Sequence, residues 1–309
     1  MYTEIASNKR KSWILIGLFI IVTTLIGWVF SQALGNPAIL YIAGVFAVVY
    51  AWISYFNSDK IALAASRAKK ISKADAPDLY RVVENLAITA GLPTPTIYII
   101  TDDAPNAFAT GRDPAHSVVC VTTGLLDRLD KTELEGVIAH ELSHVGNYDI
   151  RFMGLVVVLV AIIALLSDFF LRFAFWGGMG RRNNNSGGDG GQIQLIFICV
   201  GIALAILAPI IGMLIQLAVS RKREYLADAS GVMLTRYPEG LANALRKISD
   251  DTKPLKEANK ATASLYIVNP FRANIQGGHG SRGWMANLFS THPPINDRIA
   301  RLEHMQHEV

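Results

Sequence analysis

The chain of 309 residues is too apolar for an ordinary soluble enzyme: 51% of its residues are hydrophobic, 17% are charged, and its mean hydropathy is +0.31. Its net charge of +4 does not indicate nucleic-acid binding, because the basic residues gather at the borders of apolar stretches without interleaved aromatic residues, as expected for attraction to anionic lipid. Cys120 lies in a predicted strand and Cys199 in an apolar stretch, which argues against a disulfide framework, and the lack of C-x-x-C spacing excludes a cysteine-based zinc site.

The first predicted element is a hairpin of two membrane helices. Residues 12–58 contain no charged side chain, and residues 32–37 divide them into two stretches that are each long enough to cross a bilayer. A cleavable signal peptide is the alternative, because Ser31-Gln32-Ala33 resembles a cleavage site. The length of the first stretch, and the second that follows it at once, favour the hairpin. Basic residues flank the hairpin on both sides, namely Lys9, Arg10, Lys11, Lys60, Arg67, Lys69, Lys70 and Lys73.

A soluble segment follows the hairpin. An amphipathic helix is predicted at residues 77–90, where Gly91 stops it. Strands are predicted at residues 96–100 and 117–122, with a turn-rich region between them.

The next predicted helix carries the most informative motif of the chain, His140-Glu141-Leu142-Ser143-His144. Thr132 and Glu135 match a T-x-x-E capping box at its start, and apolar residues recur through it at helical spacing. Residues four apart lie on one helical face, so His140 and His144 can bind one metal ion, while Glu141 lies close enough to act on a water molecule without being a ligand. This H-E-x-x-H arrangement is typical of zinc-dependent peptidases.

Two further apolar stretches follow the motif. The stretch at residues 152–167 is short for a span, and Asp168 and Arg172 come directly after it, whereas residues 193–220 are uncharged throughout. Either Asp168 and Arg172 pair near the far interface of a full span, or the two stretches form a hairpin that only dips into the bilayer. Both alternatives return the chain to the side that it left, so the soluble parts before and after the stretches lie together.

A third metal ligand is expected beyond the fourth apolar stretch, because a catalytic zinc usually takes three protein ligands and leaves a fourth position open. Glu224 and Asp228 stand four apart there on a predicted helix. Together with His140 to His144, this segment resembles the glutamate-ligand zinc peptidases. The arrangement of the apolar stretches, over nearly the whole chain, resembles the HtpX heat-shock membrane proteases, which are relatives of the CaaX prenyl proteases.

The resemblance implies that Glu224 is the third zinc ligand and that Asp228 accepts a hydrogen bond from a ligating histidine. Such an acceptor would fix the tautomer and the basicity of the histidine. The alternative for Glu224 is an ion pair with Arg221 or Lys222 on the same helix.

Two further sites are implied by the same resemblance. The segment Asn106, Ala107, Phe108 and Ala109 matches the edge strand to which a substrate would add in extended conformation, and an ordinary turn-and-strand connection is the alternative. His292 would approach the metal, either to stabilise the oxyanion or to fill the open position. Alternatively, it simply lies near the cap of the helix that Pro293 and Pro294 start.

The expected fold class is an α-helical membrane protein with a cytoplasmic α+β zincin-like metalloprotease domain of the glutamate-ligand type. About four membrane helices would form two hairpins, at residues 1–56 and 153–220. Residues 57–152 and 221–309 would form the two parts of one catalytic domain. Lysine and arginine residues near the ends of the apolar stretches, including Arg221, Lys222 and Arg223, predict that this domain and both termini are cytoplasmic.

The expected activity is that of an integral-membrane zinc endopeptidase with one Zn²⁺ per chain. Through the resemblance, we expect a multi-pass protein of the bacterial inner membrane that cleaves misfolded or unassembled membrane proteins in the stress response. We expect no nucleic-acid partner, and the sequence does not indicate an oligomeric state. Three alternatives stay open: a prenyl-processing protease, which would need more spans; a site-2-type intramembrane protease, whose motif would lie in an apolar span; and a membrane scaffold with a relict metal site.

Overall fold

The computed structural model describes residues 2–33, 35–159, 221–251, 253–256, 262–270 and 293–306, together with a few single residues between 162 and 203. The third apolar stretch is described only as far as residue 159, apart from such single residues, and the fourth lies almost wholly outside the described residues. His292 also lies outside them.

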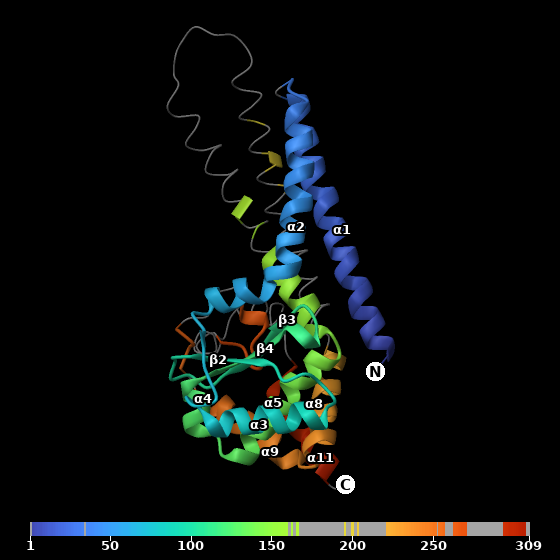
Figure 1. Cartoon of the computed structure of the whole chain (residues 1–309). Coiled ribbons are helices and arrows are strands. Elements are labelled where there is room, and N and C mark those ends of the chain that lie inside the picture. The colour runs from blue at the N-terminus through green and yellow to red at the C-terminus, as the bar shows by residue number, and fades with distance from the viewer. Residues whose placement is uncertain are drawn as a thin grey trace, which may run out of the picture.

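Two long apolar helices stand side by side above the rest of the molecule (Figure 1). They are α1 (Tyr2–Ala33) and α2 (Ala38–Ala65), and Gly35, with φ +61°, lies in the turn between them. Within the described residues, these two helices are long and apolar enough to cross a membrane, judged by length and composition. They also expose large apolar side chains, among them Trp13, Ile21, Tyr41, Ile42 and Trp52, as a lipid-facing surface would.

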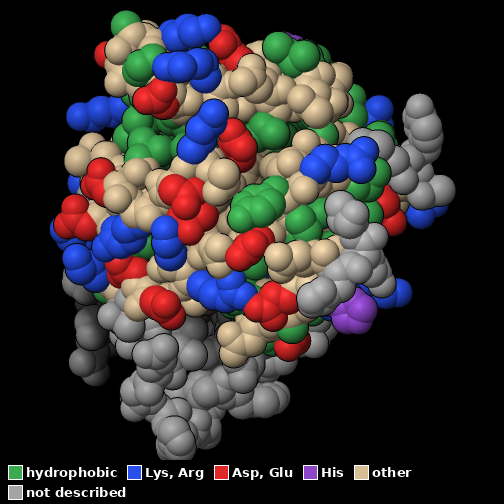
Figure 2. All heavy atoms as spheres, turned by 90° about the horizontal axis from the view of Figure 1, so that it is seen from below, with side chains coloured by type: hydrophobic (Ala, Val, Ile, Leu, Met, Phe, Trp, Pro, Cys, Tyr) green, Lys and Arg blue, Asp and Glu red, His purple; other side chains and the backbone are tan. Residues whose placement is uncertain are grey.

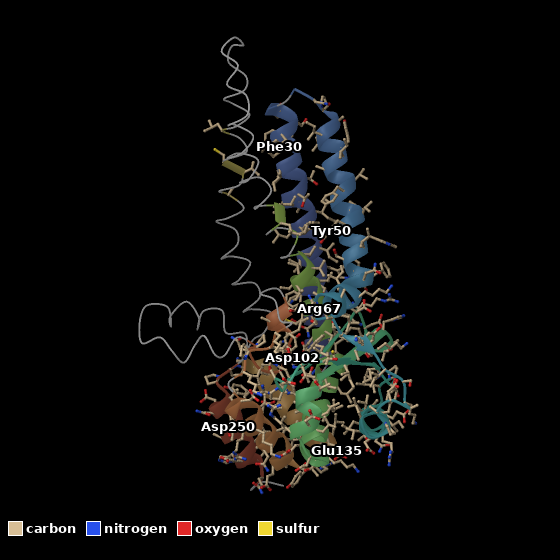
Figure 3. The ribbon with its side chains drawn as sticks, turned by 90° about the vertical axis from the view of Figure 1, so that its left-hand side faces the viewer. Phe30, Tyr50, Arg67, Asp102, Glu135 and Asp250 are labelled. Atoms are coloured by element: carbon tan, nitrogen blue, oxygen red, sulfur yellow. The ribbon has the colours of Figure 1, made fainter. Side chains whose placement is uncertain are left out.

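Helix α2 bends where it reaches the domain below. Asn57 has a non-helical backbone (φ −128°, ψ 15°), and its side-chain amide donates to the Ile53 carbonyl. The last turns of α2 then pack on the sheet through Ala62 and Leu63. Figure 3 shows this change of environment along the molecule: Phe30 and Tyr50 lie on the hairpin, Arg67 lies at its junction with the domain, and Glu135 and Asp250 lie at the far end.

A mixed four-stranded sheet forms the layer next to the hairpin. Its strands are β1 (Lys69–Lys70), β2 (Thr96–Ile100), β3 (Ala107–Gly111) and β4 (Ser117–Thr122), in the order β1-β2-β4-β3. β2 and β4 are parallel, and the other two pairs are antiparallel. The predictions for β2 and β4 are confirmed. β1 was not predicted, because two exposed lysines carry no apolar alternation.

Helices cover the other face of the sheet (Figure 1). One apolar core joins the sheet to α3, α5, α9 and α11, and it includes Val83, Val119, Ile138, Leu245 and Leu302. The face farthest from the hairpin carries Lys, Arg, Asp and Glu side chains interspersed with one another, as expected for contact with water (Figure 2). The helices of the domain are α3 (Pro77–Thr89), α4 (Thr123–Arg128), α5 (Lys131–Gly146), α8 (Arg221–Thr235), α9 (Pro238–Asp250) and α11 (Ile295–Gln306), with 3-10 turns at Pro114–His116 and Thr262–Ser264.

The start of α5 differs from the prediction. The capping box is formed by Asp130, whose carboxylate accepts from the Glu133 N–H, and by the Glu133 side chain, which accepts from the Asp130 N–H. The predicted box of Thr132 and Glu135 is wrong. Thr132 already lies inside the helix, whereas Asp130 has the extended backbone (φ −74°, ψ 176°) that an N-cap needs.

Candidate metal centre and active site

α5 presents the two histidines of the motif toward one point. The Nε2 atoms of His140 and His144 are 3.2 Å apart, and the rings meet edge to face with their centroids 4.8 Å apart. Glu141 lies between them in sequence and is buried, and its carboxylate accepts a hydrogen bond from the Ala109 backbone N–H in β3. The H-E-x-x-H motif thus has the helical geometry that its spacing predicts.

Glu224 reaches the same point from α8. Its Oε1 lies 3.5 Å from Nε2 of His144, and its Oε2 lies 3.8 Å from Nε2 of His140. Metal–ligand bonds of about 2.0–2.2 Å in a tetrahedron separate two ligand atoms by roughly 3.4 Å, so the three side chains fit one small ion. Within the described part of the chain, His140, His144 and Glu224 form the group whose ligand atoms could hold a metal.

Close packing of α8 against α5 sets these distances. Gly231, two turns after Glu224, lies so near α5 that a Cβ there would stand 3.1 Å from the His140 backbone nitrogen. A larger residue would push the two helices apart, so the glycine lets Glu224 approach the histidines.

Asp228 and Arg298 lie behind His140. Oδ1 of Asp228 lies 2.9 Å from Nδ1 of His140, and Arg298 donates to both carboxylate oxygens, from Nη2 at 2.6 Å and from Nε at 2.9 Å. We assign the proton of His140 to Nδ1, because Asp228 can only accept it there, and this leaves the Nε2 lone pair for a metal. Arg298 is completely buried and also donates to the Ile267 carbonyl.

Asp149 has the corresponding position behind His144. Its Oδ2 lies 2.9 Å from Nδ1 of His144, and it is as buried as Asp228. Each histidine therefore has a carboxylate that fixes its tautomer. Neither Arg298 nor Asp149 was among the predicted site residues: Asp149 is five residues from His144 and could have been suspected, whereas nothing local marks Arg298.

The environment of the site gives His140, Glu141 and His144 different pKa values. Burial and the positive charge of Arg298 lower the pKa of His140 to about 4, although Asp228 opposes them. Burial would also lower the pKa of His144, but the hydrogen bond to Asp149 and the charge of Glu224 outweigh it and raise the pKa to about 9. Burial raises the pKa of Glu141 to about 7, which suits a general base at neutral pH.

The predicted edge strand lies beside the site. β3 is the last strand of the sheet, and the Thr122 N–H donates to the Asn106 carbonyl, so the backbone groups of alternate residues from Ala107 onward point away from β4. The Ala107 carbonyl accepts from the Ile267 N–H at 2.9 Å, and the Asn106 amide donates to the Val268 carbonyl at 2.9 Å. The chain's own segment at 267–268 therefore covers the start of this edge, whereas Ala109 faces Glu141.

Comparison with known proteins agrees with this geometry. Residues 73–306 match peptidase family M48. Proteins named "Protease HtpX homolog" from Tropheryma whipplei strain Twist, Dictyoglomus thermophilum and Lactobacillus helveticus are 46%, 47% and 44% identical to the chain. The alignments cover 99%, 98% and 99% of this chain and 98%, 94% and 100% of those relatives.

Among solved structures, the crystal structure of S. mikatae Ste24p has a similar fold. The TM-score is 0.53, and the match covers 98% of this chain and 67% of that one. Only 19% of the residues are identical, so the similarity concerns the fold alone. The match over residues 73–306 and the full-length relatives place the candidate metal site in a known context: the chain belongs to peptidase family M48 and is a metalloprotease.

Proposed function

We propose that the chain is an integral-membrane zinc endopeptidase that hydrolyses misfolded or unassembled membrane proteins. The convergence of His140, His144 and Glu224 carries the proposal, because two imidazoles and one carboxylate are a typical donor set of a catalytic zinc. One Zn²⁺ per chain is proposed. The carboxylates behind both histidines support it, since such partners raise ligand basicity.

Peptide hydrolysis assigns a separate task to Glu141. A zinc ion held by His140, His144 and Glu224 would supply a Lewis acid that polarises the scissile carbonyl and lowers the pKa of water. Glu141 accepts the proton of the attacking water and then delivers it to the leaving amine. Its pKa of about 7 lets it do both near neutral pH, and the Ala109 N–H holds its carboxylate in place. His292 is proposed to stabilise the oxyanion, because α11, which follows it closely, already brings Arg298 into the site.

The substrate is proposed to bind as an extended strand along Asn106, Ala107, Phe108 and Ala109. β3 is the last strand in the sheet order and lies beside Glu141, so backbone hydrogen bonds to it would bring a peptide bond to the metal, once the substrate takes the place of residues 267–268 at Asn106 and Ala107. Such binding uses the backbone and so accepts many sequences, which suits removal of unfolded chains.

The protein is proposed to be a multi-pass protein of the bacterial inner membrane, with its catalytic domain and both termini in the cytoplasm. The two apolar helices and the basic residues near their ends support this orientation. Residues 57–152 and 221–309 are proposed to form one catalytic domain, because α5 and α8 supply one metal site. The bacterial relatives support the location, and a role in quality control rests on the resemblance to HtpX proteases.

The experiment uses the purified full-length chain in lipid nanodiscs with a fluorescent unfolded polypeptide. We expect hydrolysis that stops on chelation and returns with zinc. Glu141→Gln should keep its zinc and lose activity by about 10²- to 10⁴-fold, the usual contribution of a general base. Glu224→Ala should lose zinc by elemental analysis. Hydrolysis by Glu141→Gln at the parental rate would refute the mechanism, and preferential cleavage of a prenylated peptide would favour the prenyl-processing alternative.

A further inference from the structure

The cytoplasmic end of α1 contacts the turn that follows the metal-binding helix. Asn8 is completely buried, and its amide donates to Oδ1 of Asp149 at 2.6 Å and to the Asn147 carbonyl at 2.9 Å. A polar side chain at this position of an apolar helix is costly to bury without partners, so these bonds define where α1 docks. One residue of the first helix thus contacts the carboxylate that lies behind His144.

The turn itself is held by a second contact from α1. Tyr148 lies between Asn147 and Asp149 and has a left-handed backbone with φ +61°. This conformation costs a residue other than glycine roughly 1–2 kcal/mol, so neighbouring contacts must support it. The Lys9 ammonium lies 4.4 Å from the centre of the Tyr148 ring and the Arg151 guanidinium 5.0 Å from it, which are cation–π distances. All three residues of the turn therefore interact with Asn8 or Lys9.

The contacts on Asp149 are divided between its two oxygens. Oδ1 accepts from Asn8 and also lies 3.0 Å from Nε of Arg223, as an ion pair without hydrogen-bond alignment, while Oδ2 lies 2.9 Å from Nδ1 of His144. Because Asn8 fixes one oxygen, the other points at the histidine. Without Asn8, Oδ1 would keep the ion pair with Arg223, which lacks hydrogen-bond alignment, so the carboxylate would hold the ring of His144 less firmly in this orientation.

We infer that Asn8 is a positioning residue of the metal centre: through Asp149 it holds His144 in its ligating orientation, so that docking of the first membrane helix and zinc binding strengthen each other. The inference rests on the proposed zinc site. Linkage requires the effect to be reciprocal, so zinc must also strengthen the docking of α1. The hairpin then does more than anchor the protease, because detachment of α1 lowers the affinity for the metal.

The first test compares Asn8→Leu, which keeps the size of the side chain and removes its bonds, with Ser12→Ala. Ser12 is buried one turn further along α1, but its hydroxyl donates to the Asn8 carbonyl of its own helix and is the matched control. The zinc dissociation constant is measured by chelator competition on the full chain in nanodiscs, in a Glu141→Gln background that prevents self-cleavage. Loss of a direct outer partner usually weakens metal binding 10- to 100-fold, so we expect about 3- to 10-fold for Asn8→Leu and less than about twofold for Ser12→Ala.

A double-mutant cycle identifies the route of the effect. If Asn8 acts through Asp149, Asn8→Leu should weaken zinc binding by less than about twofold once Asp149→Asn is present. The inference would be overturned if the zinc dissociation constants of Asn8→Leu and the parent agreed within twofold. It would also be overturned if the effects of Asn8→Leu and Asp149→Asn on zinc binding simply added. If the parental chain itself bound no zinc, the proposed function would fall as well.

A protease-protection measurement needs no substitution at Asn8, so it applies even if Asn8→Leu does not fold. Trypsin can cut after Lys9, Arg10 or Lys11 when the end of α1 is undocked, and two of these residues are already exposed. Saturating zinc should slow this cleavage in the Glu141→Gln chain by about the factor expected for the affinity. Equal cleavage rates with zinc and with chelator would overturn the inference.

Discussion

Replacement of Arg298 by methionine tests how the site is held together. Methionine has a similar length but no charge. Asp228 would then stay buried and, of the two partners described above, would keep only His140. Removal of one member of a buried ion pair costs about 3–5 kcal/mol, because the other charge stays uncompensated. For a domain of this size, that corresponds to a fall in Tm of roughly 6–20 °C. We expect this loss before zinc is added, together with a roughly 10- to 100-fold weaker affinity for zinc.

The assay is thermal unfolding of the full chain in detergent, with zinc affinity measured in parallel. Arg301→Met is the matched control, because Arg301 lies exposed on the same helix, with its guanidinium 3.9 Å from the centre of the Tyr225 ring. A cation–π contact of this kind is worth about 0.5–1 kcal/mol. The double variant Arg298→Met with Asp228→Asn should recover much of the stability but not the affinity for zinc, since both charges are then absent.

The result that would refute this reasoning is a Tm of Arg298→Met within about 3 °C of the parent, which corresponds to roughly 1 kcal/mol. Arg298 would then contribute neither to the ionisation of Asp228 nor to the position of His140.

Two further predictions concern the same centre. Gly231→Ala should weaken zinc binding several-fold, because its Cβ would stand 3.1 Å from the His140 backbone and displace Glu224. Gly136→Ala is the control: its Cβ would meet the Leu241 backbone at 2.7 Å, so it should mainly lower Tm, by the equivalent of about 1–3 kcal/mol. Equal zinc affinity in Gly231→Ala and the parent would contradict this prediction. Since the pKa of His144 is raised to about 9, its proton must leave when zinc binds at pH 7. Calorimetry of Glu141→Gln in buffers of different ionisation enthalpy should find about one proton released, and zinc affinity should fall as the pH is lowered and His144 gains its proton. Release of no proton would contradict the assignment.

Local sequence signals predicted the parts of the fold that depend on local contacts. The amphipathic pattern of α3, the apolar strands β2 and β4, and the spacing of His140 and His144 all act within a few residues. The capping box was misplaced by two residues, because Asp130 and Thr132 are both good caps and the choice between them depends on where the preceding chain turns.

The residues that complete the site could not be predicted in this way. Arg298 bonds to Asp228 across 70 positions, and Asn8 bonds to Asp149 across 141. Neither residue has a neighbour in sequence that reveals its partner, and each alone looks ordinary: one basic residue on an amphipathic helix, and one polar residue next to a basic cluster. Glu224 was predicted only through the resemblance to a family.

The wide spacing of these residues also determines the order in which the parts of the site are made during synthesis. Asn8 leaves the ribosome first and the H-E-x-x-H helix much later. Arg298, whose guanidinium donates to Asp228, emerges later still. A nascent chain therefore carries the three candidate ligands before the arginine behind His140 has been made, since its parts are made in chain order. During that interval, the motif is present without the arginine that bonds to Asp228 behind His140.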